Sequence, residues 1–229
     1  MKGQFIVLEG TDGTGKGTQF EKLIGRLRSE DFDVATFDFP QYGHPSAFFV
    51  ERYLNGKYGT VDEIGPYRGS IFYAMDRYEA SFAIRESLER GQIVIANRYV
   101  ASNMGHQGGK ISDEHERIKY FEWLDELEFN ILGIAKPDLN IVLHVPAAIA
   151  QTLIDQKAKR EYIEQGKRDI HENDLGHLER AEQVYLEICE KFPKTFTKIE
   201  CAENGNILSI EKIHERIWAT VQLLLRREK

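Results

Sequence analysis

The residues best suited to chemistry lie near the N-terminus, in the glycine-rich stretch Phe5–Gln19. Gly10, Gly15 and Lys16 have the spacing G-x-x-x-x-G-K, which is typical of loops that hold phosphate groups. Glycines let backbone N–H groups approach phosphate oxygens closely, and a helix that begins at the lysine directs unpaired N–H groups at the same anion. We therefore expect a nucleotide-phosphate site in which Lys16 reaches the β- and γ-phosphates. The contacting residues would be Gly10, Gly13, Thr14, Gly15, Lys16, Gly17 and Thr18.

The loop departs from the usual pattern at the position after the lysine. A Ser or Thr normally stands there as a magnesium ligand, but here the residue is Gly17, and Thr18 follows it. The order G-K-G-T is similar to the loop of adenylate kinases. We therefore expect Thr18 to contact a phosphate. Mg²⁺ would be held mostly by water and nucleotide oxygens, with no certain ligand from the protein.

The composition is that of an ordinary globular protein, and we expect a single domain over residues 1–229. Hydrophobic residues make up 41% of the chain and charged residues 29%. The formal net charge of −7 argues against a nucleic-acid binder, because phosphate backbones need a basic face, and no apolar run is long enough to span a membrane. Met1 leads almost directly into the first predicted strand, so we expect no signal peptide. Cys189 and Cys201 are expected to be reduced thiols of a cytoplasmic protein.

Apolar runs alternate with amphipathic runs along the whole chain. Continuous apolar runs are typical of strands that are buried on both faces of a parallel sheet. Strands that alternate with helices predict an α/β fold of the P-loop NTPase type, in which five parallel strands form the middle of three layers. The predicted strands are 5–8, 34–37, 93–96, 140–145 and 196–199, and the predicted helices are 17–29, 47–54, 67–90, 113–132, 147–157, 178–190 and 210–226.

The carboxyl ends of the strands are where a sheet of this kind binds its ligands. Arg98 follows the apolar run 93–96 almost directly. A cation at a strand end, in the same sheet as a phosphate loop, is expected to hold a second phosphate. The second strand ends in Asp38, Phe39 and Pro40, and Asp38 is predicted to be a solvated turn residue rather than a ligand.

The predicted helix 67–90 allows two interpretations. Arg68, Tyr73 and Arg77 recur four to five residues apart near one face, where an aromatic ring between two arginines could seat a base and its phosphate. Arginines on a solvated surface helix explain the same pattern, and the residues alone favour that simpler interpretation. The predicted buried stripe of this helix is Ile71, Phe72, Met75 and Phe82.

The segment 156–174 is dense in charges of both signs. A charge run is usually a solvated face. Because this one contains Gly166 and lies between two predicted helices, a mobile lid of about 157–176 is the second interpretation. A lid over a phosphoryl-transfer site brings cations in and excludes water.

Together these stretches resemble the thymidylate kinases, P-loop kinases that transfer a phosphate from ATP to dTMP to give dTDP and ADP. The resemblance covers nearly the whole chain, and its specificity comes from five stretches in the family's order. These are EGTDGTGKGTQ (9–19), FYAMDR (72–77), NRYVASNMGHQGG (97–109), KPDLNIVLHV (136–145) and RDIHE (168–172).

The resemblance implies roles for residues in these stretches. Arg98 would hold the dTMP phosphate, and Asp12 would lie near the sugar 3′-hydroxyl and the waters of the metal. Tyr73 or Phe72 would stack on the thymine, and Arg77 would lie at the edge of the base. The substrate-binding set would be Asp12, Phe39, Pro40, Arg68, Phe72, Tyr73, Arg77, Arg98, Tyr99, Ser102, His106 and Gln107.

The resemblance also implies a catalytic cation from the lid. The loop has Gly13 where one subclass of the family carries an arginine, so Arg160 or Arg168 becomes the candidate. ATP would be the co-substrate and Mg²⁺ the cofactor, and members of the family are typically homodimers packed through helices. Catalysis would rest on Lys16, Arg98, Asp12 and Arg160 or Arg168, and the adenine would lie near Ala202, Glu203 and Asn204.

Two positions depart from the family's pattern. Asn97 stands where an aspartate is usual, which removes a carboxylate near Mg²⁺. Gln41 and Tyr42 stand in a loop where part of the family has a phosphate-binding arginine, and Arg68 is the candidate replacement. Two alternatives therefore stay open. The protein could be a kinase of another nucleotide or nucleoside, or a non-catalytic nucleotide-binding module that keeps the fold.

Overall fold

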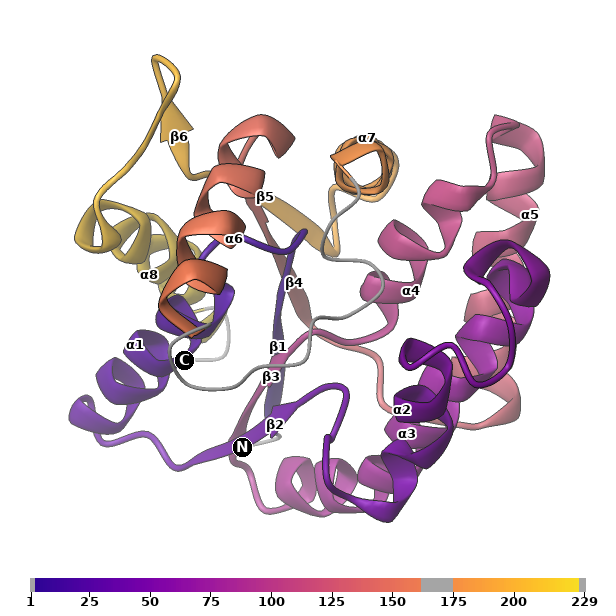
Figure 1. Ribbon diagram of the computed structural model, residues 1–229. Helices are drawn as coiled ribbons and strands as arrows, with labels where there is room; N and C mark the ends of the chain where they lie inside the picture. The colour runs from indigo at the N-terminus through magenta and orange to yellow at the C-terminus, as the bar shows by residue number, and fades with distance from the viewer. Residues whose placement is uncertain (1–2, 162–174, 227–229) are drawn as a thin grey trace.

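The computed structural model describes residues 3–161 and 175–226, and for residues 157–161 it describes only the backbone. Its centre is a parallel sheet with the strand order β2-β3-β1-β4-β5 (Figure 1). Each pair of neighbouring strands is parallel, so the chain crosses over a face of the sheet between them. The predicted α/β fold with five parallel strands is confirmed. The strands are β1 (Gln4–Glu9), β2 (Val34–Asp38), β3 (Ile93–Asn97), β4 (Leu139–His144) and β5 (Phe196–Glu200).

The middle strand β1 shows why its sequence is a continuous apolar run. Phe5, Ile6, Val7 and Leu8 have no exposed surface. Successive side chains of a strand point to opposite faces, so Ile6 and Leu8 pack in one core cluster while Phe5 and Val7 pack in the other. Both faces are covered by helices, and both therefore require apolar residues.

Helices form a layer on each face of the sheet (Figure 1). On one face, Leu23 and Leu27 pack in the same cluster as Ile217 and Val221, as the apolar spacing of the last helix predicts. That layer contains α1 (Lys16–Ser29), α6 (Ala147–Glu161) and α8 (Ile210–Arg226). The other layer contains α3 (Val61–Glu89), α4 (Val100–His106) and α7 (Leu175–Lys191), with α5 (Glu114–Asp125) packed outside α4 and α7.

Shorter elements connect these layers. A 3-10 turn at Pro45–Ala47 leads into α2 (Phe48–Leu54), and a second 3-10 turn at Gly108–Lys110 follows α4. A small hairpin of β6 (Ala202–Glu203) and β7 (Asn206–Ile207) precedes α8. Within the described ranges, no helix has both the length and the apolar content needed to cross a bilayer.

The long helix α3 differs from its prediction in which side is buried. Ile71, Met75 and Phe82 are 41%, 43% and 54% exposed, so the predicted buried stripe is wrong. The helix also begins earlier, with a break at Gly65, whose φ is 69°. Its buried side carries Ile64 and Ile84, and the other buried residues are small or polar. These residues include Gly69, Ser70, Ala74, Asp76, Arg77, Ala80 and Ser81.

Three further segments differ from prediction in their helical extent. The residues after Arg98, expected to form a loop, form α4. The predicted helix 113–132 is divided, because α5 ends at Asp125 and a π-helix, η3 (Glu126–Ile131), follows it. The ends of the predicted lid 157–176 are helical, since α6 continues to Glu161 and α7 begins at Leu175. Residues 162–174 lie outside the described part of the chain.

Candidate active site

The glycine-rich loop between β1 and α1 has the geometry of an anion site. Gly10, Gly13 and Gly15 have φ values of 136°, 79° and 80°, a region that side chains disfavour. A Cβ on Gly13 would lie 2.4 Å from a carbonyl oxygen of α6, so close packing also requires glycine there. No side chain caps the start of α1, and its first turn contains no acidic residue. Gly17 and Thr18 lie exposed in that first turn, and its amides are directed as phosphate binding requires.

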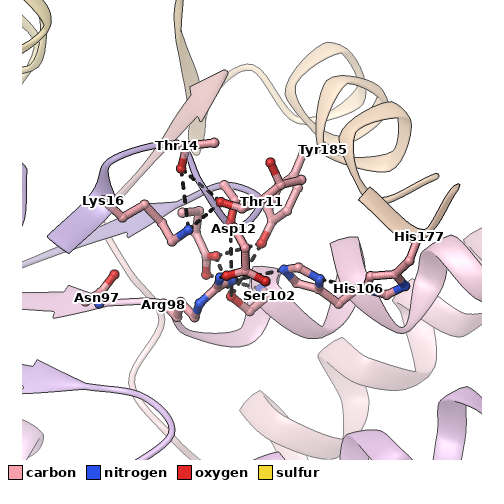
Figure 2. A network of polar contacts seen from close by, with 12 residues as sticks. Thr11, Asp12, Thr14, Lys16, Asn97, Arg98, Ser102, His106, His177 and Tyr185 are labelled. Atoms are coloured by element: carbon pink, nitrogen blue, oxygen red, sulfur yellow. Dashed lines mark hydrogen bonds and ion pairs between the residues drawn. The ribbon is translucent and has the colours of Figure 1, made fainter. Parts of the chain in front are cut away.

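Lys16 is buried beside the loop that precedes it. Its Nζ donates to the Thr11 carbonyl oxygen at 2.6 Å and lies 3.4 Å from Thr14 Oγ1 (Figure 2). Neither partner is charged. Burial and the positive charge of Arg98 lower the pKa of Lys16 to about 7, although Asp12 and other carboxylates oppose this shift. The ammonium is therefore ready to be stabilised by an arriving anion.

Arg98 is held between the loop and a neighbouring pocket. It follows β3 with a φ of 66°, which is unusual for a residue with a side chain. Its Nη2 donates to Asp12 Oδ1 at 2.5 Å. Its Nη1 lies 3.2 Å from both the Gly10 carbonyl oxygen and Ser102 Oγ, and 3.0 Å from His106 Nε2. The guanidinium is thus fixed at the boundary between the two sites.

Asp12 is the carboxylate that two cations share. Burial would raise its pKa, but the charges of Arg98 and Lys16 outweigh that effect and hold the pKa well below its usual range. Asp12 is therefore ionised at any physiological pH. Because Thr11 and Asp12 are consecutive, Lys16 and Arg98 converge on one short stretch of the loop (Figure 2).

Glu9 is a buried carboxylate that connects β1 to the helices around the site. It accepts hydrogen bonds from the Tyr99 and Ser102 amides at 2.7 and 3.1 Å, from Ser102 Oγ at 2.7 Å and from Tyr185 Oη at 3.0 Å. The two amides belong to the start of α4, where a negative charge is favourable. Glu9 thus fixes the helix that follows Arg98 and connects it to α7.

A pocket beside Arg98 contains most of the predicted substrate residues. It lies between the end of β2, the buried side of α3 and the helices α4 and α7. Its lining includes ten of the twelve predicted substrate residues: Asp12, Phe39, Pro40, Tyr73, Arg77, Arg98, Tyr99, Ser102, His106 and Gln107. It also includes Tyr42, Leu54, Asn103 and His177, which were not in the predicted set.

Arg77 lines this pocket from a buried ion pair. It is 2% exposed and makes two hydrogen bonds to Glu128, at 2.7 and 2.5 Å. Its Nη1 also lies 3.3 Å from the Tyr99 carbonyl oxygen. Burial opposes the charge on Arg77, but Glu128 outweighs it and raises its pKa. The side chain is therefore a fixed cation in the pocket wall.

Two predicted substrate residues lie elsewhere. Arg68 is exposed, and its guanidinium donates to the Ile64 and Glu63 carbonyl oxygens of its own helix, at 2.8 and 2.6 Å. It does not line the pocket, so this geometry does not support its predicted role as a replacement phosphate ligand. Phe72 is also absent from the lining, because its ring stacks on Phe49 at 6.0 Å and packs with α2. Tyr73 is the aromatic residue of this helix that reaches the pocket.

The remaining predictions concern the lid and the adenine. The side chain of Arg160 and the whole of Arg168 lie outside the described residues. Ala202, Glu203 and Asn204 belong to the β6–β7 hairpin and its turn. This hairpin precedes α8. Gln19 Nε2 of α1 donates to the carbonyl oxygen of Ile210, the first residue of α8, at 2.9 Å. The hairpin therefore lies on the phosphate-loop side of the molecule.

The unusual Asn97 pairs with a neighbouring strand end. Asn97 Nδ2 donates to Asp38 Oδ1 at 2.8 Å, and burial raises the pKa of Asp38 although this bond, Arg98 and Lys16 oppose the shift. Asp38 is exposed, as the sequence predicts, but it is the last residue of β2 and pairs with Asn97 rather than lying in a turn. The carboxylate missing at position 97 is present on the adjacent strand.

Several site residues were missed by the sequence reasoning. Glu9 had a signal, since an acidic residue ends an apolar strand directly before the glycine-rich loop. Asn103 directly follows Ser102 and lines the same pocket, within the helix α4 that the sequence reasoning took for a loop. His177 and Glu128 had no local signal, because long-range packing brings them to the site.

Comparison with known proteins identifies the family. The family model for thymidylate kinase matches residues 8–217. The thymidylate kinase of Mycobacterium tuberculosis is 34% identical over 185 residues, which cover 80% of this chain and 84% of that protein. The chain belongs to the thymidylate kinase family.

Other relatives agree with this assignment. A probable thymidylate kinase of Thermococcus kodakarensis is 30% identical over 232 residues, covering 98% of this chain and all of that protein. The solved structure of thymidylate kinase from Candida albicans has a TM-score of 0.69 and covers 97% of this chain and 92% of its own, and at 22% identity it supports the fold alone. Thymidylate kinases are nucleoside monophosphate kinases, so the predicted family and enzyme class are both confirmed.

Proposed function

We propose that this protein transfers the γ-phosphate of ATP to dTMP, giving ADP and dTDP. The observation that carries this proposal is the convergence of Lys16 and Arg98 on the consecutive residues Thr11 and Asp12. ATP phosphates on the glycine-rich loop would contact Lys16. The phosphate of an acceptor in the pocket would contact Arg98. In-line phosphoryl transfer requires this arrangement of donor and acceptor.

The chemistry would depend on positioning and charge neutralisation. The acceptor is a phosphate oxygen that is largely ionised near neutral pH, so no strong general base is needed. Arg98 would exchange Asp12 for the acceptor phosphate, which would free Asp12 to face the sugar hydroxyl. Lys16 would neutralise charge on the transferred group, together with Arg160 or Arg168 from the lid. Tyr73 and Arg77 would contact the base.

Mg²⁺ is the proposed cofactor, and the donor set of the site limits how it could bind. Gly17 offers no hydroxyl ligand, and the nearest carboxylate, Asp12, is paired with Arg98. In residues 3–156 and 175–226, whose side chains the structure describes, there is no group of three or more His, Cys, Asp or Glu that could hold a metal. These residues fit an ion held mainly by nucleotide phosphates and water, close to Asp12. When bound, Mg²⁺ neutralises phosphate charge.

A homodimer is proposed because one face of α2 and α3 is apolar and exposed. Ile71, Met75 and Phe82 are exposed on α3, and Phe48 and Phe49 are exposed on α2, where Phe49 stacks on Phe72 of α3. A large exposed apolar patch commonly marks an interface. A second copy of the chain, packed through the same helices, would bury it. This proposal agrees with the helix-mediated dimers typical of the family.

We also propose a single domain that works in the cytoplasm. The sheet and both helix layers share continuous core clusters, which supports one folding unit over the described residues. Cys189 and Cys201 form no disulfide, as a reducing compartment requires. The proposed substrates, ATP and a nucleoside monophosphate, are both small anions, and the proposal includes no nucleic acid and no membrane.

The release of ADP in the presence of ATP, Mg²⁺ and dTMP tests the proposed reaction. Lys16→Ala should lower kcat at least 100-fold and leave the melting temperature near that of the wild type. Arg98→Ala should lower kcat/KM for dTMP about 100-fold, which corresponds to about 2.7 kcal/mol, and change the KM for ATP less than about twofold. Equal effects of Arg98→Ala on both substrates would contradict the assignment of Arg98 to the acceptor.

A further inference from the structure

A chain of two histidines extends from Arg98 to α7. Arg98 Nη1 lies 3.0 Å from His106 Nε2, and His106 Nδ1 lies 3.2 Å from His177 Nε2 (Figure 2). The two imidazole rings are nearly parallel, with an interplanar angle of 25° and centroids 5.4 Å apart. Both rings line the pocket proposed for the acceptor. The chain therefore connects α4 and α7 through the cation at the boundary of the site.

The order of the atoms determines where the protons lie. Arginine can only donate, so His106 Nε2 must accept, and a neutral His106 then carries its proton on Nδ1. That proton points to His177 Nε2, which must accept in turn. His177 is therefore neutral as well, with its proton on Nδ1. Any other arrangement would place two N–H donors against each other at one of the two contacts.

The surroundings of His106 favour its neutral form. Burial and the charge of Arg98 hold the pKa of His106 well below its usual range, and His177 and Lys16 act in the same direction. Asp12 opposes this shift. Tyr185 of α7 also faces the His106 ring, with centroids 6.0 Å apart, and its hydroxyl donates to Glu9.

We propose that His177 is a positioning residue for Arg98, acting through His106, and that both imidazoles are locked in the Nδ1-protonated tautomer. The kinetic part of this inference rests on the proposed function, in which Arg98 binds the acceptor phosphate. His106 restrains the guanidinium at Nη1, whereas Asp12 holds Nη2, and His177 restrains His106. The helix α7 thereby contributes to the orientation of Arg98, which directly follows β3, although the two are distant in sequence.

Nitrogen NMR of the histidine rings tests the tautomers without any substrate. In ¹⁵N-labelled wild-type protein at pH 8, the resonances of His106 and His177, assigned with the variants His106→Gln and His177→Phe, should show a protonated Nδ1 and an unprotonated Nε2. His115 is exposed on α5 and serves as an internal reference for a solvated ring. A protonated Nε2 on either His106 or His177 would overturn the proposal, whatever reaction the enzyme performs.

Two substitutions of His177 test the positioning role. His177→Phe keeps a ring against His106 but removes the acceptor, and should raise the KM for dTMP about three- to tenfold, the loss expected for one hydrogen bond between two neutral groups. The KM for ATP and kcat should each change less than about twofold. His177→Gln restores an acceptor oxygen and should return the KM for dTMP to within about twofold of the wild type.

The controls separate this inference from the proposed reaction. His115→Phe changes the same residue type on the surface and should leave the kinetic constants unchanged. A KM for dTMP that is unchanged in His177→Phe, or raised equally in His177→Gln, would overturn the positioning role. Absence of dTMP turnover in the wild type would instead refute the proposed function. The nitrogen NMR measurement would still test whether His106 and His177 are locked in the Nδ1-protonated tautomer.

Discussion

Lys16 and Arg98 are cations that lie beside the same short loop, but they are stabilised differently. Lys16 has carbonyl and hydroxyl partners, so burial lowers its pKa to about 7. Arg98 has the Asp12 carboxylate, so it stays charged although it is largely buried. The two residues should therefore respond differently when a phosphate group binds.

ATP binding should be coupled to proton uptake by Lys16. Phosphate charge raises the pKa of Lys16 from about 7, so at pH 8 the complex binds more protons than the free protein, and ATP affinity falls as the pH rises above about 7. Calorimetric titration at pH 8 in two buffers of different ionisation enthalpy measures this uptake. Lys16→Met should reduce it, and an equal uptake in both proteins would refute the assignment.

The pairing of Asn97 with Asp38 gives a reason for an asparagine at position 97, because the side chain that it contacts is a carboxylate. Asn97→Asp would place a second carboxylate against Asp38, whose pKa is already raised. Protonation would relieve the repulsion at low pH, so the destabilisation should grow as the pH rises through the raised pKa values. The melting temperature should fall about 3–6 °C at pH 8 and less at pH 5.

The exchanged pair provides the control for this prediction. Asp38→Asn combined with Asn97→Asp restores one amide and one carboxylate across the two strands. The double variant should recover most of the stability lost by Asn97→Asp alone. If the double variant were no more stable than the single one, the pairing would not account for the asparagine.

At the scale of elements, all five strands of the main sheet are predicted from the sequence. The signal is clearest where burial on both faces requires apolar residues such as Phe5 and Leu8, and weaker in the partly exposed edge strands β2 and β5. The helix α4 was missed because it has only seven residues, several of which are polar, and because no side chain caps its start. Most residues that line the pocket were predictable from motifs. The position of Arg68 was not, because only the fold shows that its guanidinium donates to carbonyl groups of its own helix.

The π-helix η3 has a function that the sequence does not reveal. It brings Glu128 into the core, where the carboxylate pairs with Arg77 of α3. Glu128→Ala would leave a buried guanidinium without its partner, so the free energy of unfolding should fall by about 3–5 kcal/mol. Urea denaturation measures this loss. Glu122→Ala, an exposed position on α5, should change stability less than about 0.5 kcal/mol, and similar losses in both variants would contradict the role of the pair.

At the scale of the whole molecule, the outward apolar side of α3 is the largest disagreement with the sequence prediction. Periodicity identified a stripe but could not tell whether the stripe faces the protein's own sheet or another chain. Ile71, Met75 and Phe82 are exposed, whereas the opposite side of the same helix forms part of the pocket. An interface on this helix would therefore lie directly behind the acceptor site.

A dimer through this face should depend on its apolar side chains. Analytical ultracentrifugation of the wild type should give the mass of two chains at micromolar concentration. Met75→Asp would place a charge in the centre of the buried patch and should shift the protein to monomer. Lys119→Glu, an exposed change on α5, should leave the mass unchanged. A monomeric wild type would contradict the proposal.

Phosphorylation of dTMP is the reaction that the site of this thymidylate kinase family member supports best. The most direct measurement is ADP release from ATP and Mg²⁺ with dTMP, dUMP, dCMP, dGMP and thymidine tested in parallel. We expect a clear preference for dTMP, and little turnover of thymidine because it lacks the phosphate that Arg98 would bind. Preference for another acceptor would keep phosphoryl transfer but overturn the assignment of the pocket. No turnover of any acceptor, with ATP still bound, would contradict the account and favour a non-catalytic nucleotide-binding module.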